Sequence, residues 1–313
     1  MPSKEAERWN QLFQSFPKDP PGTPHDYAAE HADNASRPLP PPPQGVRVEP
    51  VCYDGVDGEI VQPDEPNGSA IWYIHGGGLT TGSARERREL TFHLAEKYAC
   101  TVVASNYRLA PENRWPAQQD DCMTFYRAML ANGFDPKRLF FMGESAGGML
   151  VLSVALRARD EGLPLPAGIA AFSPGTGVFD EFPSHTTNIP TDYMLGDALT
   201  RQDQNIAVFG TTQPSDAQLR HPYYAPFFGD FNGLPPIFLS ASDYEVLLDD
   251  AVRLHDKLVQ EGHLTAIDVA HGVLHAYPIF PDMPEAQETI DNAVRFLLHP
   301  NVSRPSIASL SPA

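Results

Sequence analysis

A short apolar run, followed by a Gly-x-Ser-x-Gly pattern and a long helical stretch, limits the possible folds of this chain more than any other feature. Residues 139–142 are four consecutive apolar residues, which is typical of a short buried strand. The residues after Ser145 are good helix formers for about four turns, up to Arg159. The Gly-Glu-Ser-Ala-Gly pattern at 143–147 is therefore predicted to lie at a strand-to-helix turn.

A serine at such a turn takes a strained backbone conformation and projects its hydroxyl away from the sheet. Glycines at Gly143 and Gly147 let the strand and the helix approach without a clash of Cβ atoms. Ser145 also lies at a helix N-terminus, where free N–H groups favour a developing negative charge. We therefore predict that Ser145 is a nucleophile on an elbow turn.

Strand-like and helix-like segments alternate along much of the chain. Strands are expected at 70–75, 101–105, 169–172, 237–241 and 265–269, and helices at 85–98, 116–131, 247–260 and 285–298. Ser83 and Glu86 form a plausible capping box, and Pro116 suits the first turn of its helix. Residues 46–62 indicate an antiparallel hairpin at a sheet edge. This order predicts the α/β class, with a mostly parallel sheet and helices on both faces.

Two regions interrupt the alternation. Residues 1–45 combine a helical patch near 8–16 with many prolines and are expected to form an arm. Residues 176–232 form a long insertion with one helical patch near 200–209. We expect both regions to contribute to a lid over a catalytic domain made of 46–175 and 233–300, with 301–313 as a disordered tail.

The composition excludes several classes of protein. The chain has 40 acidic and 22 basic residues and a net charge of −18, which disfavours binding to nucleic acid or to an anionic membrane. Its three widely spaced cysteines form neither a disulfide framework nor a zinc motif. No secretory signal or membrane-spanning stretch is visible. We expect a cytoplasmic protein with free thiols, and the sequence leaves its oligomeric state open.

A second glycine-rich segment lies upstream of the elbow. His-Gly-Gly-Gly at 75–78 ends a predicted strand, and its glycines leave backbone N–H groups uncovered. Together with the N–H of Ala146, the N–H groups of Gly77 and Gly78 are predicted to form an oxyanion hole. His75 is expected to shape the loop.

A nucleophilic serine needs a base. In hydrolases with this elbow the chain order is serine, acid, histidine, and the histidine follows a late strand. His271 and His275 both occupy such a position. His275 lies deeper in the loop, past Gly272, and is the preferred base, while His271 is expected at the exposed end of the strand.

Two carboxylates could orient this histidine. The segment after 237–241 contains Asp243 and Glu245, whereas Asp249 and Asp250 fall in the opening turns of the next helix, where the helix dipole favours acids. Either Asp243 or Glu245 could hold the imidazole and stabilise its cation. Spacing alone does not choose between them.

Three motifs in this order resemble the hormone-sensitive-lipase-like family of α/β-hydrolase esterases, which is bacterial family IV with its fungal relatives. They are His-Gly-Gly-Gly at 75–78, Tyr-Arg-Leu-Ala-Pro-Glu at 107–112 and Gly-Glu-Ser-Ala-Gly-Gly at 143–148. The resemblance covers about 68–300. It implies the α/β-hydrolase fold, a carboxylic ester hydrolase, and a lid made from the arm and the insertion. The 107–112 block is interpreted as structural.

The resemblance also bears on the acid, although the chain departs from the family pattern. Relatives carry Asp-Pro-Leu-x-Asp, and the best match here begins at Glu245 and ends at Asp249, so the resemblance favours Glu245, with Asp243 in reserve. The family's His-Gly-Phe is replaced by His-Ala-Tyr from His275, which keeps the histidine.

These observations predict a serine carboxylesterase for short- to medium-chain esters. Ser145, His275 and Glu245 would act through an acyl-enzyme, with a small-molecule ester as substrate and no metal or organic cofactor. The alternatives are an amidase or arylformamidase with the same triad, or a non-catalytic small-molecule receptor; the resemblance implies that such receptors lose the catalytic histidine, which is present here. Aromatic residues of the insertion could line the acyl pocket or form the core of the lid; they are Phe179, Phe182, Tyr193 and Phe209.

Overall fold

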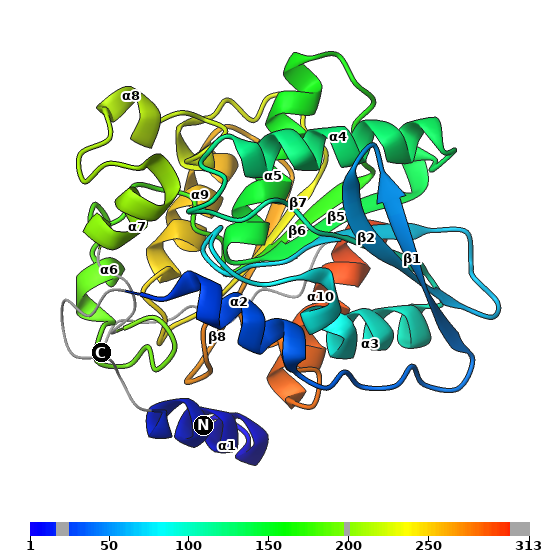
Figure 1. Ribbon diagram of the computed structural model, residues 1–313, viewed down its shortest axis with the longest axis horizontal. Coiled ribbons are helices and arrows are strands. Elements are labelled where there is room, and N and C mark those ends of the chain that lie inside the picture. Colours follow the sequence, from blue (N-terminus) through cyan, green and yellow to red (C-terminus); the bar gives the residue numbers. More distant parts are fainter. Residues whose placement is uncertain (17–24, 197–200, 301–313) are drawn as a thin grey trace.

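The computed structural model describes residues 1–16, 25–196 and 201–300, which form an eight-stranded sheet covered by helices (Figure 1). The strands are β1 (Val46–Tyr53), β2 (Val56–Pro63), β3 (Ala70–Ile74), β4 (Thr101–Ser105), β5 (Leu139–Glu144), β6 (Gly168–Phe172), β7 (Ile237–Ser242) and β8 (Thr265–Ala270). The α-helices are α1 (Lys4–Ser15), α2 (Tyr27–Ser36), α3 (Arg88–Tyr98), α4 (Ala117–Ala131), α5 (Ala146–Asp160), α6 (Ser184–Thr187), α7 (Arg201–Phe209), α8 (Asp216–Leu219), α9 (Leu248–Gln260) and α10 (Pro284–Leu298). Short 3-10 turns are η1 (Ala84–Arg87), η2 (Pro136–Arg138), η3 (Pro226–Phe228) and η4 (Tyr277–Ile279). No helix in the described ranges is long and apolar enough to cross a membrane.

The sheet has the order β1-β2-β4-β3-β5-β6-β7-β8. β1 and β2 form the antiparallel hairpin at one edge, β2 pairs antiparallel with β4, and all later neighbours pair in parallel. Every residue of β3, β5, β6 and β7 is buried. Strands buried on both faces have continuous apolar runs, and this explains their pattern in the sequence. The predicted α/β class with a mostly parallel sheet is confirmed.

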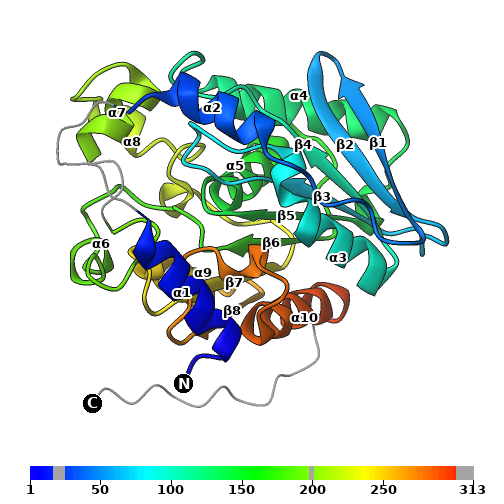
Figure 2. The same ribbon diagram turned by 60° about the horizontal axis from the view of Figure 1, so that its bottom comes forward.

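Helices cover both faces of the sheet (Figure 2). On one face, α4, α5 and α9 pack over a core that contains Trp72 and Phe141. On the other face, α3 and α10 pack over a core that contains Tyr73, Leu90 and Ile290. All five of these side chains are fully buried. The two cores fix the central strands, and therefore the loops that leave their ends.

The helix after β3 begins differently from the prediction. The expected capping box of Ser83 and Glu86 is wrong, because the Ser83 hydroxyl donates to the Glu86 carboxylate at 2.7 Å and makes no bond to a backbone N–H. The chain first forms η1, and α3 begins only at Arg88. Pro116 is the N-cap of α4, one position before the helix.

The arm contains a helix that the proline-rich composition did not predict. α2 is capped by Asp26, whose side chain accepts the N–H of Ala29 at 2.9 Å. The preceding prolines at 17–24, the start of the helical patch at residue 200 and the expected tail at 301–313 lie outside the described residues. α1 lies beside α10 (Figure 2), where the N–H of Ser3 donates to the Glu285 carboxylate at 2.6 Å.

Candidate active site

The elbow turn lies between the last residue of β5 and the first residue of α5. Ser145 has φ +54° and ψ −122°, a region that residues other than glycine rarely occupy and that costs about 1–3 kcal/mol. Two hydrogen bonds hold this conformation: the N–H of Ser145 donates to the carbonyl of Phe172 at 2.8 Å, and the carbonyl of Ser145 accepts the N–H of Met149 at 3.0 Å. Ser145 is half-buried between Glu144 and Ala146, which are both buried.

Glycine is required on both sides of Ser145. A Cβ atom on Gly143 would lie 2.6 Å from the carbonyl oxygen of Gly147, and one on Gly147 would lie 2.0 Å from the carbonyl oxygen of Ile74. Both contacts involve backbone atoms that cannot move aside. The helix can therefore approach β3 closely only with these glycines, as the sequence pattern predicted.

The loop after β3 approaches the elbow. Gly77 and Gly78 have φ values of +110° and +61°, and a Cβ on Gly77 would lie 2.2 Å from the carbonyl oxygen of Thr81. Within the described ranges, neither of their N–H groups donates to a protein acceptor. Ala146 is the first residue of α5, so its N–H has no acceptor inside the helix. All three amides predicted to form the oxyanion hole are therefore available as donors.

Glu144 ties this loop to the elbow. Its carboxylate is buried and accepts the N–H of Gly76 at 2.6 Å, the Nε of Arg87 at 2.6 Å and the hydroxyl of Tyr73. Burial and the adjacent Glu144 charge raise the pKa of Tyr73, which keeps the phenol protonated and donating. The motifs of the sequence do not reveal Glu144 and Arg87 as supports of the loop. The one signal is an acidic residue at the end of a buried apolar strand.

His75 supports the same loop from its other side. Its Nδ1 lies 2.8 Å from the carbonyl oxygen of Gly76, and its ring stacks on Tyr107 with centroids 4.3 Å apart. Burial lowers the pKa of His75 to about 4, so the ring is neutral at physiological pH. The Tyr107 hydroxyl donates to the carbonyl of His75 at 3.0 Å. Both residues therefore act on the shape of the loop.

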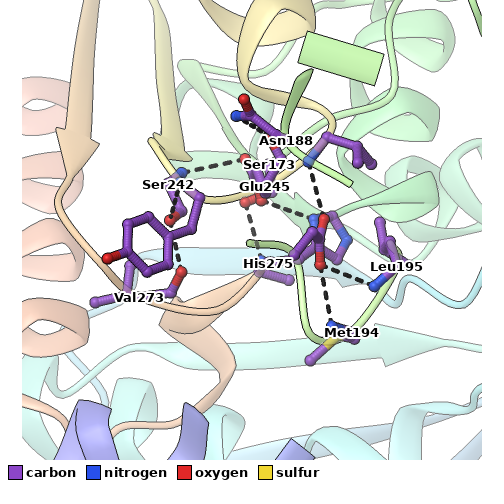
Figure 3. A network of polar contacts seen from close by, with 12 residues as sticks. Ser173, Asn188, Met194, Leu195, Ser242, Glu245, Val273 and His275 are labelled. Carbon is purple, nitrogen blue, oxygen red and sulfur yellow. Dashed lines mark hydrogen bonds and ion pairs between the residues drawn. The ribbon is translucent and has the colours of Figure 1, made fainter. Parts of the chain in front are cut away.

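Glu245 and His275 meet in a buried hydrogen bond (Figure 3). Glu245 follows β7, His275 lies in the loop after β8, and the distance from His275 Nδ1 to Glu245 Oε2 is 2.7 Å. Their side chains are 0% and 3% exposed, respectively. The other carboxylate oxygen accepts the N–H of Ser242 at 3.2 Å. The Nε2 atom of His275 is buried and has no hydrogen-bond partner among the described residues.

This environment changes the acidity of both groups. Burial raises the pKa of Glu245, and the hydrogen bond with His275 only partly opposes this effect. Burial lowers the pKa of His275, but the hydrogen bond and the charge of Glu245 outweigh it, so the pKa lies above its ordinary value. Glu245 therefore favours the protonated form of the imidazole.

The reserve acid, Asp243, has a different partner. Its Oδ2 lies 2.6 Å from the Nδ1 of His271, and its Oδ1 accepts the N–H of Gly272 at 2.8 Å. The His271 side chain is 63% exposed. The structure therefore brings Glu245 to His275 and places the Asp243–His271 pair at the surface.

The aromatic residues of the insertion have several environments. Phe182 is buried against Phe227, and Phe209 packs against Trp115, so both side chains take part in aromatic packing. Phe179 is 37% exposed and Tyr193 is half-buried. In the described part of the chain, no group of three or more His, Cys, Asp or Glu side chains could hold a metal ion.

Comparison with known proteins places this fold among related chains. A family model for the alpha/beta hydrolase fold matches residues 71–279. An acetyl-hydrolase of Streptomyces hygroscopicus is 32% identical over 240 residues, which cover 76% of this chain and 78% of the relative. A structure of EstE5 soaked with p-nitrophenyl butyrate matches with a TM-score of 0.85 and 29% identity. The match covers 95% of this chain and 99% of the EstE5 chain. The structure of an esterase from the bacterial hormone-sensitive lipase family matches with a TM-score of 0.81 and 29% identity. The match covers 95% of this chain and 98% of that esterase chain.

The chain therefore belongs to the α/β-hydrolase fold family. Within this family it is one of the carboxylic ester hydrolases of the hormone-sensitive-lipase-like group, as the motifs at 75–78 and 143–148 predicted.

Proposed function

We propose that this chain is a serine carboxylesterase that hydrolyses short- to medium-chain esters through Ser145, His275 and Glu245. The observation that carries the proposal is the buried 2.7 Å hydrogen bond between Glu245 and His275 Nδ1, which leaves the buried Nε2 without a protein partner. A base with one nitrogen held by a carboxylate and the other free is the arrangement that activates a serine.

The reaction proceeds in two halves. The Nε2 of His275 takes the proton of the Ser145 hydroxyl, and the serine oxygen attacks the ester carbonyl. The N–H groups of Gly77, Gly78 and Ala146 stabilise the oxyanion, each by about 3–4 kcal/mol in comparable sites. Glu245 stabilises the imidazolium, which then protonates the departing alcohol. Water repeats these steps on the acyl-enzyme and releases the acid.

The preference for short acyl groups rests on the relatives. One of them is an acetyl-hydrolase, and EstE5 was soaked with p-nitrophenyl butyrate. A cytoplasmic location is also part of the proposal, because Cys52, Cys100 and Cys122 are free thiols.

The test compares wild type, Ser145→Ala and the control Ser15→Ala, which changes an exposed serine of α1. We expect wild type and the control to hydrolyse p-nitrophenyl acetate and butyrate, and Ser145→Ala to lose at least about 10³-fold in kcat. A fluorophosphonate probe should label wild type and the control only.

Undiminished turnover or labelling in Ser145→Ala would overturn the proposal. A matched pair of ester and anilide substrates with the same acyl group distinguishes an esterase from an amidase or arylformamidase. A non-catalytic receptor would bind without turnover and without labelling.

A further inference from the structure

The loop that carries Glu245 is held by a segment of the insertion that the mechanism above does not use. Residues 188–192 lie between α6 and α7 and contact residues 243–246 through side chains. The Asn188 side-chain amide donates to the carbonyl of Asp243 at 3.0 Å and to the carbonyl of Glu245 at 2.9 Å. One side-chain amide thus fixes the two peptide groups whose carbonyls belong to Asp243 and Glu245.

Two hydroxyl groups of the insertion donate to the other two carbonyls of this loop. The Thr191 hydroxyl donates to the carbonyl of Tyr244 at 2.9 Å, and the Ser184 hydroxyl donates to the carbonyl of Val246 at 2.7 Å. Each carbonyl from residue 243 to residue 246 therefore accepts a hydrogen bond from the insertion. A loop held at every carbonyl keeps its side chains within a narrow range of positions.

Asp192 adds the matching contact to an N–H group. One oxygen of its carboxylate accepts the N–H of Val246 at 2.9 Å, and the other accepts those of Met194 at 3.0 Å and Leu195 at 2.8 Å. Asp192 is 3% exposed and has no Lys, Arg or His ion-pair partner among the described residues. A buried carboxylate held only by amides keeps its negative charge available to its neighbours.

We propose that Asp192 is a positioning residue for the catalytic pair: it fixes the loop of Glu245 from the insertion, and its charge supports the imidazolium form of His275. This inference rests on the proposed function. It gives the insertion a role in placing the acid, because residues 188–192 hold the loop that carries Glu245.

The charges around His275 favour this role. The negative charges of Glu245, Asp192 and Glu144 each raise the pKa of the imidazole. Glu144 is paired with Arg87, so part of its field is cancelled. Asp192 also raises the pKa of Glu245. Asp192 has no cationic ion-pair partner among the described residues, and its charge acts on both members of the pair.

The test is Asp192→Asn, measured as the pH dependence of kcat/KM with p-nitrophenyl butyrate and of the inactivation rate by phenylmethylsulfonyl fluoride. Without the charge, His275 loses its proton more easily, so the acid limb of both profiles should move to lower pH by about half to one pH unit. At the pH plateau kcat should fall about 5- to 20-fold, with KM changed less than about twofold, because the imidazolium of the transition state loses support.

Asp250→Asn is the matched control. Asp250 is also a buried carboxylate at the insertion, and it accepts the N–H groups of Thr176 and Gly177 at 2.6 and 2.7 Å, but its partner is His185. It is not among the main charges that raise the pKa of His275. This variant should lower the melting temperature and leave the acid limb in place.

Asn188→Ala provides a second test that keeps the charge of Asp192. It removes both amide contacts to the loop, so kcat should fall about 5- to 20-fold while the acid limb stays fixed. The inference is overturned if folded Asp192→Asn keeps the wild-type acid limb, if Asp250→Asn moves that limb equally, or if Asn188→Ala retains wild-type kcat. Failure of the proposed function would give a different result: the wild-type protein would neither hydrolyse esters nor react with the sulfonyl fluoride.

Discussion

The carboxylate of Glu245 and the imidazole of His275 are almost completely removed from water, and each is the main charged partner of the other. Their arrangement also fixes the tautomer, because an Nδ1–H that donates to Glu245 leaves Nε2 as the acceptor that a serine proton requires. Asp243, two residues earlier, makes an equally short contact to His271, but at the surface. Burial and partner therefore distinguish two acid–histidine pairs that look similar in the sequence.

This difference predicts a large loss of kcat for one conservative substitution and a small change for another. Glu245→Gln should lower kcat by about 10³- to 10⁴-fold, because the amide can hold the imidazole in the wrong tautomer and cannot stabilise its cation. Asp243→Asn should change kcat less than about tenfold, since it affects an exposed pair. The measurement is kcat for p-nitrophenyl butyrate, with circular dichroism to verify folding. A larger loss in Asp243→Asn than in Glu245→Gln would show that the acid is misassigned.

The acidity of His275 predicts the pH dependence of activity. Only the neutral imidazole accepts the serine proton, so activity falls as the pH drops through the pKa of His275. Because Glu245 raises this pKa, the acid limb of kcat/KM should have its midpoint above about pH 6.5, the ordinary value for histidine. A profile from about pH 5 to about pH 9 measures it. A midpoint well below that of a free imidazole would contradict the prediction.

At the scale of secondary-structure elements, the turn from β5 to α5 determines the position of the nucleophile. The first turn of α5 approaches β3 so closely that the carbonyls of Ile74 and His75 occupy the space of any Cβ on Gly147. This proximity places the N–H of Ala146 near the loop that carries Gly77. The glycine pattern is thus a packing requirement between two elements as well as a conformational one.

Gly147→Ala should therefore damage folding severely. A Cβ 2.0 Å from the carbonyl oxygen of Ile74 forces the helix away from the strand, and we expect a loss of more than about 4 kcal/mol in the free energy of unfolding. Gly162→Ala is the control: it has φ +71° with no atom within 4 Å of the added Cβ, and should cost only about 1–2 kcal/mol. Urea denaturation followed by circular dichroism measures both. Equal losses in the two variants would refute the packing argument.

At the scale of the whole molecule, segments outside the central α/β alternation support each candidate catalytic loop. α1 contacts the histidine loop, where the Asn10 side chain donates to the carbonyl of Gly272 at 2.8 Å. α2 contacts the loop after β3 that carries Gly77 and Gly78 (the oxyanion loop), where His31 Nε2 lies 2.6 Å from the carbonyl oxygen of Thr80. From α7, the Gln204 side chain donates to the carbonyl of Gly78 at 2.8 Å. The arm and the insertion are thus part of the support of the site.

The net charge of −18 is also a property of the whole molecule, and it predicts a salt effect. An ester with a free carboxylate on its acyl chain is repelled by this field, so its kcat/KM should rise about two- to tenfold between about 10 mM and about 0.5 M NaCl. p-Nitrophenyl butyrate, which is neutral, should change little and serves as the control. A carboxylated ester that loses activity with added salt would indicate a local cationic subsite.

Local patterns in the sequence determined the class of the fold, the strands and helices of the central α/β alternation within a few residues, and the elbow at Ser145. Burial on two faces and close backbone approach leave these patterns in consecutive residues, as in the apolar run at 139–142 and the glycines around Ser145. The capping box at Ser83 failed for a reason that spacing does not reveal: its side chain had a competing partner in Glu86.

Only the tertiary structure decided which carboxylate meets His275, how Glu144 joins the oxyanion loop to the elbow, and how residues 188–192 hold the loop of Glu245. These contacts join residues that are about 30 to 70 positions apart in the chain. Such distances leave no periodic trace, because a hydrogen bond between two side chains depends on where the sheet and its helices place them. Asp243 and Glu245 differ by two positions in the sequence, and the packing around their loop gave them different partners.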